Sequence, residues 1–232
     1  MLFGWFYYDW TILIVLPALI ISMIAQAKVS SAYKKYAAYS TRNVTGYAAA
    51  RAILDSNGLS HVAIERVRGH LTDHYDPKTN VIRLSDSVYD AANVAAVGVA
   101  AHEAGHAVQY AFGYAPIKLR MAIIPVTRFG SMMAVPLFMI GLLMASEYFM
   151  VLGIVLYAAV TLFQLVTLPV EFNASSRALK ALDARGILSS EQKVGAKKVL
   201  SAAALTYVAA LLTSLLTLLR LVLLASNRNS RR

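Results

Sequence analysis

The chain has 232 residues, of which 58% are hydrophobic, and its mean hydropathy is +0.57, which is too apolar for an ordinary soluble domain. It contains no cysteine, so disulfides, thiolate metal sites and a cysteine nucleophile are excluded, and any metal must be bound by His, Asp or Glu. The net charge of +10 comes from Lys and Arg that flank apolar runs, without a block of like charges or a nucleic-acid motif. We therefore predict no nucleic-acid partner and expect a lipid bilayer around the apolar segments.

The N-terminal segment predicts a membrane anchor. A nearly uncharged run from Thr11 to Ala27 follows an aromatic cluster of the kind that lies at a bilayer interface, Trp5, Phe6, Tyr7, Tyr8 and Trp10. A cleaved signal peptide is the alternative, because "AQA" at 25–27 resembles a cleavage site. A signal peptide has a basic n-region, however, where this chain has Asp9. We expect the segment to be retained.

The next hundred residues are more polar and predict a folded region outside the membrane. "TRNVTGYAAARAILDSNGLS" predicts a helix that begins near Thr45 and ends at Gly58. The segments "HVAIERVRG" and "HLTDHYDPKTNVIRLS" alternate β-branched with polar residues and predict a small sheet or hairpin with a turn at "DPKTN". A helix of five or six turns is expected to follow through "VAAHEAGHAVQYA", with Ser85 or Ser87 capping its first turn.

Three further apolar runs bring the expected number of spans to four. Residues 121–146 and 149–170 are separated only around Glu147 and predict a transmembrane hairpin, and Ala202–Leu224 predicts the last span. The fold class is thus a mainly α integral membrane protein with about four transmembrane helices and a small α+β domain carrying a short hairpin or sheet. We divide the chain into an anchor (1–27), a catalytic region (28–120), the hairpin (121–170), a helix and loop (171–200), and a final span with a basic tail (201–232).

The basic residues also predict the orientation of the chain. Lys and Arg cluster after the first span, before the second, and between the third and fourth, whereas the short opposite segments carry Asp9 and Glu147. This bias predicts that the region outside the membrane is cytoplasmic. The basic tail "SNRNSRR" argues the other way.

The segment "HEAGH" carries the chemistry that stands out most. On a helix, His102 and His106 lie four residues apart on one face, where both imidazoles can bind a single metal. Glu103 lies on the neighbouring flank, where it can deprotonate a water without becoming a ligand. A hydrogen-bonded histidine pair and a structural metal site are the alternatives. Two His and one carboxylate would leave a position open for water, whereas structural zinc usually has four protein ligands.

Glu171 is the best candidate for the third ligand. It follows the predicted hairpin, in a segment that Pro169 could start as a helix, and a hairpin returns the chain to the face it left. A solvated glutamate at a helix start is the alternative. His74, Asp73 and Asp76 are rival ligands, although Asp76 before Pro77 suits a turn. His61 and His70 have no informative spacing.

These residues carry a family resemblance. "HEAGHAVQ", "PVEFNASSRAL" and "LTDHYDPKTNVIRLS" together resemble the bacterial membrane neutral zinc metallopeptidases of the YugP type, over almost the whole chain. The resemblance implies a zincin-like, gluzincin-type endopeptidase of the bacterial plasma membrane, with one zinc on His102, His106 and Glu171 and with Glu103 as general base. Ligand type and availability favour zinc over manganese or cobalt. The chain is more distantly similar to the heat-shock protease HtpX and the CAAX prenyl protease, which have an Asp where this chain has Ser175.

The sequence leaves several residue roles open. Asn173 is our prediction for the partner of a metal-binding histidine, and His74, Tyr75 and Arg177 are candidates for contacting the oxyanion or the substrate. The strand "HLTDHY" is expected to present an edge to an extended substrate. An intramembrane-cleaving metalloprotease and a non-catalytic membrane adaptor with a metal site are the alternative functions. The substrate is expected to be a peptide or membrane protein, and the sequence does not predict the oligomeric state.

Overall fold

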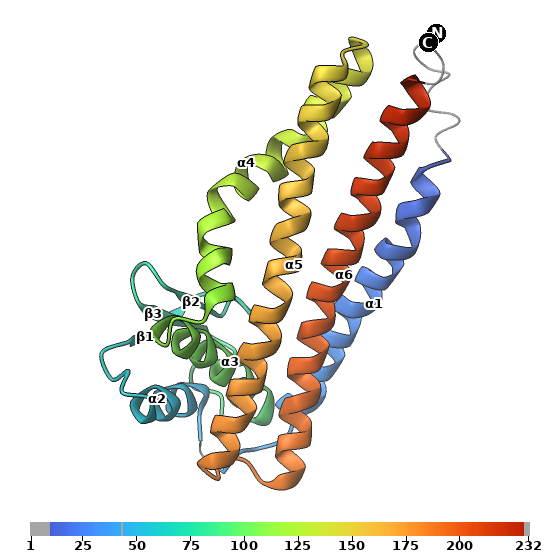
Figure 1. The fold of residues 1–232 in the computed structure, drawn as a ribbon. Helices are drawn as coiled ribbons and strands as arrows, with labels where there is room; N and C mark the ends of the chain where they lie inside the picture. Colours follow the sequence, from blue (N-terminus) through green and yellow to red (C-terminus); the bar gives the residue numbers. More distant parts are fainter. Residues whose placement is uncertain (1–9, 43, 230–232) are drawn as a thin grey trace. The chain divides into compact units, whose positions relative to one another are not determined.

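The computed structural model describes residues 10–42 and 44–229, and within these it contains six helices and one three-stranded sheet (Figure 1). The helices are α1 (Ile12–Ala37), α2 (Gly46–Ser56), α3 (Val94–Ala111), α4 (Ala115–Leu143), α5 (Glu147–Ala184) and α6 (Ser190–Asn229). The strands are β1 (Ala63–Val67), β2 (His74–Asp76) and β3 (Val81–Ser85). The residues from Trp5 to Asp9 lie outside the described part.

The chain forms two compact units, and α1, α4, α5 and α6 each contribute to both. We call them unit 1 (Met1–Ile24, Leu119–Leu168 and Thr206–Arg232) and unit 2 (Ala25–Lys118 and Pro169–Leu205). The three strands, α2, α3 and the C-terminal part of α5 belong to unit 2.

The sheet of unit 2 has the strand order β1-β3-β2. Strands β2 and β3 form the predicted antiparallel hairpin, and the carboxylate of Asp76 accepts hydrogen bonds from the main-chain N–H of Lys78 and the hydroxyl of Thr79 within its turn. Asn80 closes this turn with a φ of 56°, a left-handed conformation that Asn tolerates. The parallel pairing of β1 with β3 was not predicted. It leaves β2 as an edge strand.

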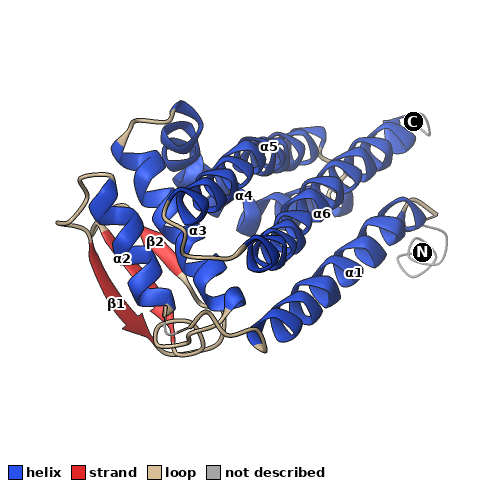
Figure 2. Ribbon diagram, turned by 90° about the horizontal axis from the view of Figure 1, so that it is seen from below, coloured by secondary structure: helices blue, strands red, loops and turns tan. Residues whose placement is uncertain are grey.

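Helix α2 lies over one face of this sheet (Figure 2). The hydroxyl of Thr45 caps the helix by accepting a hydrogen bond from the N–H of Ala48, and Gly58 follows its end with a φ of 71°, as predicted. Its buried face packs into one apolar core with the central strand, through Ile53, Leu54, Ile82 and Leu84. Helix α3 packs into the same core, which contains most of the alanines of that helix.

Helix α3 begins later than we predicted. The side chain of Asn93 caps it by accepting a hydrogen bond from the N–H of Ala96, so the prediction that Ser85 or Ser87 caps the helix is wrong. Ser85 is instead the last residue of β3, and its hydroxyl donates to Asp73. Ser85 is therefore held in the sheet and by Asp73, and the helix begins only after Asn93.

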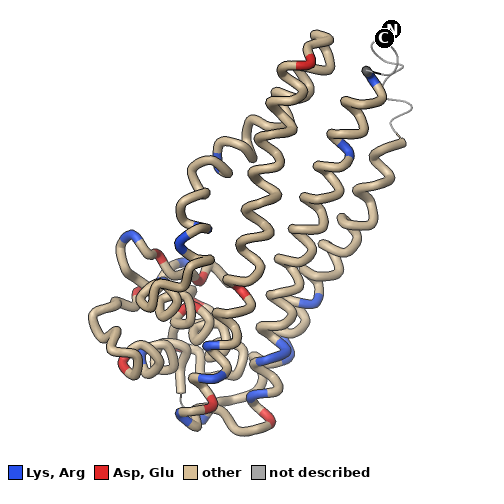
Figure 3. Tube along the Cα trace, viewed as in Figure 1, with Lys and Arg blue, Asp and Glu red and all other residues tan. Residues whose placement is uncertain are grey.

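Four helices are long and apolar enough to cross a membrane, namely α1, α4, α5 and α6. Charged residues are sparse where these helices run through unit 1 (Figure 3). Many large apolar side chains are exposed there, for example Leu13, Met132 and Leu165, and a lipid environment covers such surface without the cost it would have in water. These features confirm the predicted mainly α fold with four candidate spans and a small sheet.

Helix α5 runs without a break from Glu147 to Ala184, and Pro169 lies inside it. The prediction that Pro169 starts a new helix is therefore wrong. A proline inside a helix removes one hydrogen-bond donor, but the following segment "EFNASSRALKALDA" is rich in Ala and Leu, which favour continuation. As a result Glu171 lies on the same helix as the third predicted span, two residues after Pro169, where that helix enters unit 2.

Candidate metal centre

Three side chains of unit 2 come together as a candidate metal site. His102 and His106 project from α3 and Glu171 from α5, and one ligand atom of each lies within 4.8 Å of the others. The Nε2 atoms of His102 and His106 lie 3.2 and 3.5 Å from Oε2 of Glu171. Within the described residues, this is the group of His, Asp and Glu side chains placed to hold a metal ion.

The Nδ1 atoms of both imidazoles, which point away from Glu171, also have hydrogen-bond partners. Nδ1 of His102 lies 3.1 Å from the hydroxyl of Ser175, and Nδ1 of His106 lies 3.0 Å from Oε1 of Gln109. Both Nε2 atoms consequently face Glu171, the arrangement in which two imidazoles and a carboxylate bind one ion. This donor set fits zinc and leaves a fourth coordination position for water.

Glu103 lies on α3 between the two histidines in sequence and is 8% exposed. Burial raises the pKa of its carboxyl group to about 7, and the negative charges of Glu171 and Asp73 add to this effect, while His102 and the main chain of Tyr75 oppose it. A carboxyl group with a pKa near neutrality can accept a proton and release it again.

The close approach of α3 and α5 explains why Glu171 reaches the histidines. Gly105 lies one residue before His106, and a Cβ atom there would be 2.7 Å from the main-chain oxygen of Ala174. Only glycine permits this distance without a shift of one helix. The amide of Gln109 also donates to the main-chain oxygen of Val170, which ties the two helices together beside the site.

The rival ligands from the hairpin region are engaged elsewhere. The carboxylate of Asp73 accepts hydrogen bonds from the main chain and hydroxyl of Ser85, and its pKa is raised by burial, against those hydrogen bonds. Asp76 belongs to the turn, as its position before Pro77 suggested. His74 is exposed on the edge strand, with Nδ1 2.9 Å from the main-chain oxygen of Thr72.

The predicted site residues Tyr75, Asn173 and Arg177 also have hydrogen-bond partners in unit 2. The hydroxyl of Tyr75 donates to Asn80, and its pKa is raised to about 12, mainly by burial. Oδ1 of Asn173 accepts from Nε2 of Gln109 and from Nε of Arg177. Asn173 thus contacts the glutamine that binds His106.

Gln109 is a residue of the candidate site that the sequence analysis did not identify. It lies three residues after His106, so both side chains project from the same face of α3. An amide within a helix built mainly of Ala, Val and Gly was the available signal, since a buried amide needs hydrogen-bond partners.

Comparison with known proteins gives the family. The family described as "Putative neutral zinc metallopeptidase" matches residues 11–226. The chain belongs to this family. It is 48% identical over 217 residues to "Putative membrane protease YugP" of Bacillus subtilis (strain 168), covering 93% of this chain and 96% of that relative. No solved structure matches the chain.

Family membership confirms the resemblance drawn from the sequence motifs. It makes this chain a member of a family of zinc metallopeptidases, and the four apolar helices make it a membrane protein. His102, His106 and Glu171 are the candidate metal ligands of this chain.

Proposed function

We propose that the protein is a membrane-bound zinc-dependent endopeptidase of the gluzincin type, with His102, His106 and Glu171 as the zinc ligands and Glu103 as the general base. The convergence of two Nε2 atoms on one buried carboxylate supports this proposal most strongly. Such a site has an open position and a neighbouring carboxyl group, which hydrolysis requires and structural zinc does not.

Zinc would supply a Lewis acid that polarises the scissile carbonyl and lowers the pKa of water. The carboxylate of Glu103 would take the proton from water and pass it to the leaving amine. Its raised pKa suits both steps, because the group has to be deprotonated before attack and protonated before the amine leaves. His74, Tyr75 and Arg177 remain the candidates for contacting the oxyanion or the substrate.

The edge strand β2 is the proposed binding place for the substrate. It pairs with β3 along one edge, so an extended peptide could pair with the other edge through main-chain hydrogen bonds. The main chain of Tyr75 in β2 also interacts with the carboxyl group of Glu103, which would bring a peptide on this strand near the general base. We expect substitutions of side chains in residues 70–75 to reduce cleavage, and unchanged cleavage would refute this assignment.

We further propose that the catalytic region is cytoplasmic. Because the chain lacks cysteine, single cysteines report orientation without background. Ser189→Cys lies between α5 and α6, and Met144→Cys lies between α4 and α5. In intact cells, a membrane-impermeant thiol reagent should label Met144→Cys and leave Ser189→Cys unlabelled. The reverse pattern would refute the proposed orientation.

Glu103→Gln tests the peptidase proposal. The variant should bind zinc with an affinity close to that of the wild type and lose cleavage of a casein-like or membrane-protein substrate by at least about a hundredfold, the lower end of what a general base contributes. Glu191→Gln, an exposed glutamate in the first turn of α6, is the matched control and should retain activity.

Three outcomes would overturn parts of this proposal. Wild-type protein that binds no zinc would refute the metal site. Full cellular function of Glu103→Gln would identify a non-catalytic adaptor. Cleavage confined to transmembrane segments of substrates would identify an intramembrane protease.

A further inference from the structure

A row of hydrogen bonds leads away from His106 and ends at a cation. Oε1 of Gln109 lies 3.0 Å from Nδ1 of His106. Nε2 of Gln109 donates to Oδ1 of Asn173 at 2.9 Å and to the main-chain oxygen of Val170 at 2.8 Å. Nε of Arg177 donates to the same Oδ1 at 2.7 Å. All of these residues belong to unit 2.

Two groups that can play only one role, the guanidinium of Arg177 and the main-chain carbonyl of Val170, determine which atom donates and which accepts in each of these hydrogen bonds. A guanidinium has only donors, so Arg177 requires the oxygen of Asn173 to face it. A main-chain carbonyl only accepts, so Val170 requires the NH₂ group of Gln109. The oxygen of Gln109 is then left for His106, and Nδ1 of that imidazole has to carry a hydrogen. In the neutral imidazole, the form that binds a metal, Nε2 then carries the lone pair and lies on the side of the ring that faces Glu171.

We propose that Gln109 is a positioning residue that holds His106 in the Nδ1–H form with Nε2 directed at the metal, and that Asn173 and Arg177 fix the orientation of the Gln109 amide. This inference rests on the proposed function for the identity of the metal. It assigns a role to a residue that neither binds the ion nor touches the substrate.

Burial makes the orientation of Gln109 nearly obligatory. Its side chain is fully buried, and its oxygen and nitrogen both have partners. A reversed amide would place its oxygen against two acceptors, the carbonyl of Val170 and Oδ1 of Asn173. Buried groups left without a complementary partner carry the full cost of their lost hydration, so the reversed state is strongly disfavoured.

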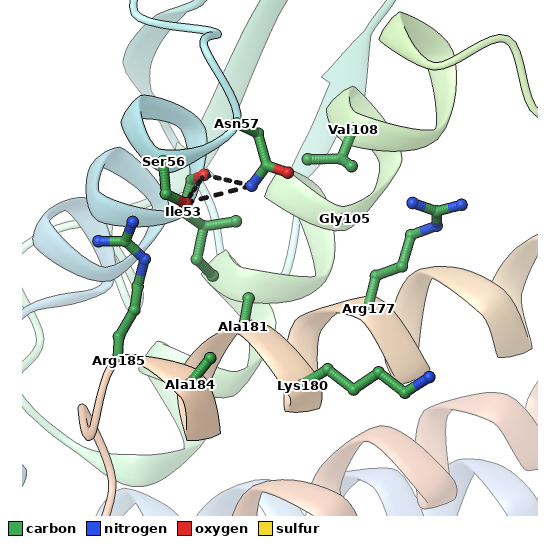
Figure 4. A pocket seen from close by; sticks show the side chains of 10 residues that line it. All are labelled: Ile53, Ser56, Asn57, Gly105, Val108, Arg177, Lys180, Ala181, Ala184 and Arg185. Carbon is green, nitrogen blue, oxygen red and sulfur yellow. Dashed lines mark hydrogen bonds between the residues drawn. The ribbon is translucent and has the colours of Figure 1, made fainter.

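Arg177 reaches Asn173 from the side of a cavity. With Lys180 and Arg185 it lines a space of about 430 Å³ between α2, α3 and α5, and Gly105 and Val108 form part of the opposite wall (Figure 4). The guanidinium also lies 6.0 Å from the ring of Tyr114. Arg177 can thus keep its charge near solvent while Nε holds Asn173 in place.

The two metal-binding histidines are held differently. The partner of His102 is the hydroxyl of Ser175, which can donate or accept, so that contact does not dictate which nitrogen carries the hydrogen. Of the two imidazoles, only that of His106 therefore has a partner that determines which of its nitrogens carries the hydrogen. We expect substitutions at Gln109 and Asn173 to lower the affinity for zinc by more than their loss of folding stability accounts for.

The test measures zinc affinity of the purified full-length protein by competition with a chelator. Gln109→Leu should weaken zinc binding by about 10–100-fold, the range found for residues that orient metal-binding histidines. Asn173→Leu should also weaken it, by about tenfold, whereas Asn173→Asp should remain close to the wild type, because Asp still offers an acceptor to Arg177 and Gln109. Gln192→Leu, at the start of α6, is the matched control and should have no effect.

A second measurement distinguishes a role in positioning His106 from a general effect on folding. ¹⁵N spectra of histidine-labelled, zinc-loaded protein should show His106 with hydrogen on Nδ1 and zinc on Nε2. Zinc on Nδ1, or wild-type affinity in Gln109→Leu, would overturn this inference while leaving the proposed peptidase intact. Equal losses in Asn173→Leu and Asn173→Asp would also overturn the assigned role of Asn173. Wild-type protein that binds no zinc would overturn both the inference and the proposed function.

Discussion

Gly105 of α3 lies so close to Ala174 of α5 that a side chain at position 105 would be 2.7 Å from the main-chain oxygen of residue 174. Gly105 is next to His106 on one helix, and Ala174 lies three residues after Glu171 on the other. The distance between these two helix backbones therefore determines whether the carboxylate reaches the two imidazoles.

We predict that Gly105→Ala separates the helices and weakens zinc binding by at least about tenfold. Real Cβ atoms do not approach another atom so closely, and overpacking of this kind costs about 1–3 kcal/mol, of which 1.4 kcal/mol corresponds to a factor of ten in affinity. Competition with a chelator measures the affinity, and a thermal melt measures the accompanying loss of stability.

Gly98→Ala is the control for this experiment. Gly98 is also a buried glycine of α3, but a Cβ there would lie 3.6 Å from the Cβ of Ala196, an ordinary contact. Replacing a helical glycine by alanine then stabilises the helix by about 0.5–1 kcal/mol. Gly98→Ala should keep its zinc affinity and melt at a higher temperature. Equal behaviour of the two variants would show that helix propensity rather than the close approach controls the site.

Ser175 should contribute to zinc binding through His102. We predict that Ser175→Ala, which removes the partner 3.1 Å from Nδ1, weakens zinc binding by about tenfold, since the imidazole loses the group that orients it. Ser176→Ala provides the comparison, because Ser176 is the next residue and is exposed. If Ser175→Ala binds zinc as tightly as Ser176→Ala, packing alone orients His102.

Local sequence predicts some of this fold well. The start of α2 near Thr45, the turn after Asp76 and the apolar spans depend on residues close together in the chain, and the structure contains them. The start of α3 and the continuity of α5 past Pro169 were predicted wrongly. In both places a distant or competing interaction decides: the pairing of β3 holds Ser85, and helix-forming residues continue α5.

The candidate site, too, is predicted from local sequence only in part. The spacing of His102 and His106 places them on one helical face regardless of the rest of the chain. The choice of carboxylate depends on tertiary structure, because Asp73, Asp76 and Glu171 are equally suitable by residue type. The roles we assign to Gln109 and Gly105 depend on contacts with residues more than 60 positions away, Val170 and Ala174. No local pattern contains that information.

Asp76 should make the hairpin sensitive to acid. Hydrogen bonds from Thr79 and Lys78 to its carboxylate lower its pKa to about 2. A pKa that is lower in the folded than in the unfolded state stabilises the fold above pH about 4, the ordinary value, and this contribution disappears as the pH falls toward 2. Melting temperatures of metal-free protein should fall more steeply between pH 4 and 2 in the wild type than in Asp76→Asn. Parallel curves would contradict the prediction.

Glu171 should link zinc binding to folding stability. A ligand that binds only the folded state stabilises it by about 2.7 kcal/mol at a concentration a hundred times its dissociation constant. Zinc should therefore raise the melting temperature of the wild type, and a chelator should reverse the change. Glu171→Gln keeps the size of the side chain but removes the charge between the two imidazoles, so we predict that it loses most of this zinc-dependent rise. Glu191→Gln should keep it, because Glu191 is exposed at the start of α6. An undiminished rise in Glu171→Gln would mean that another carboxylate, with Asp73 the first to test, completes the metal site.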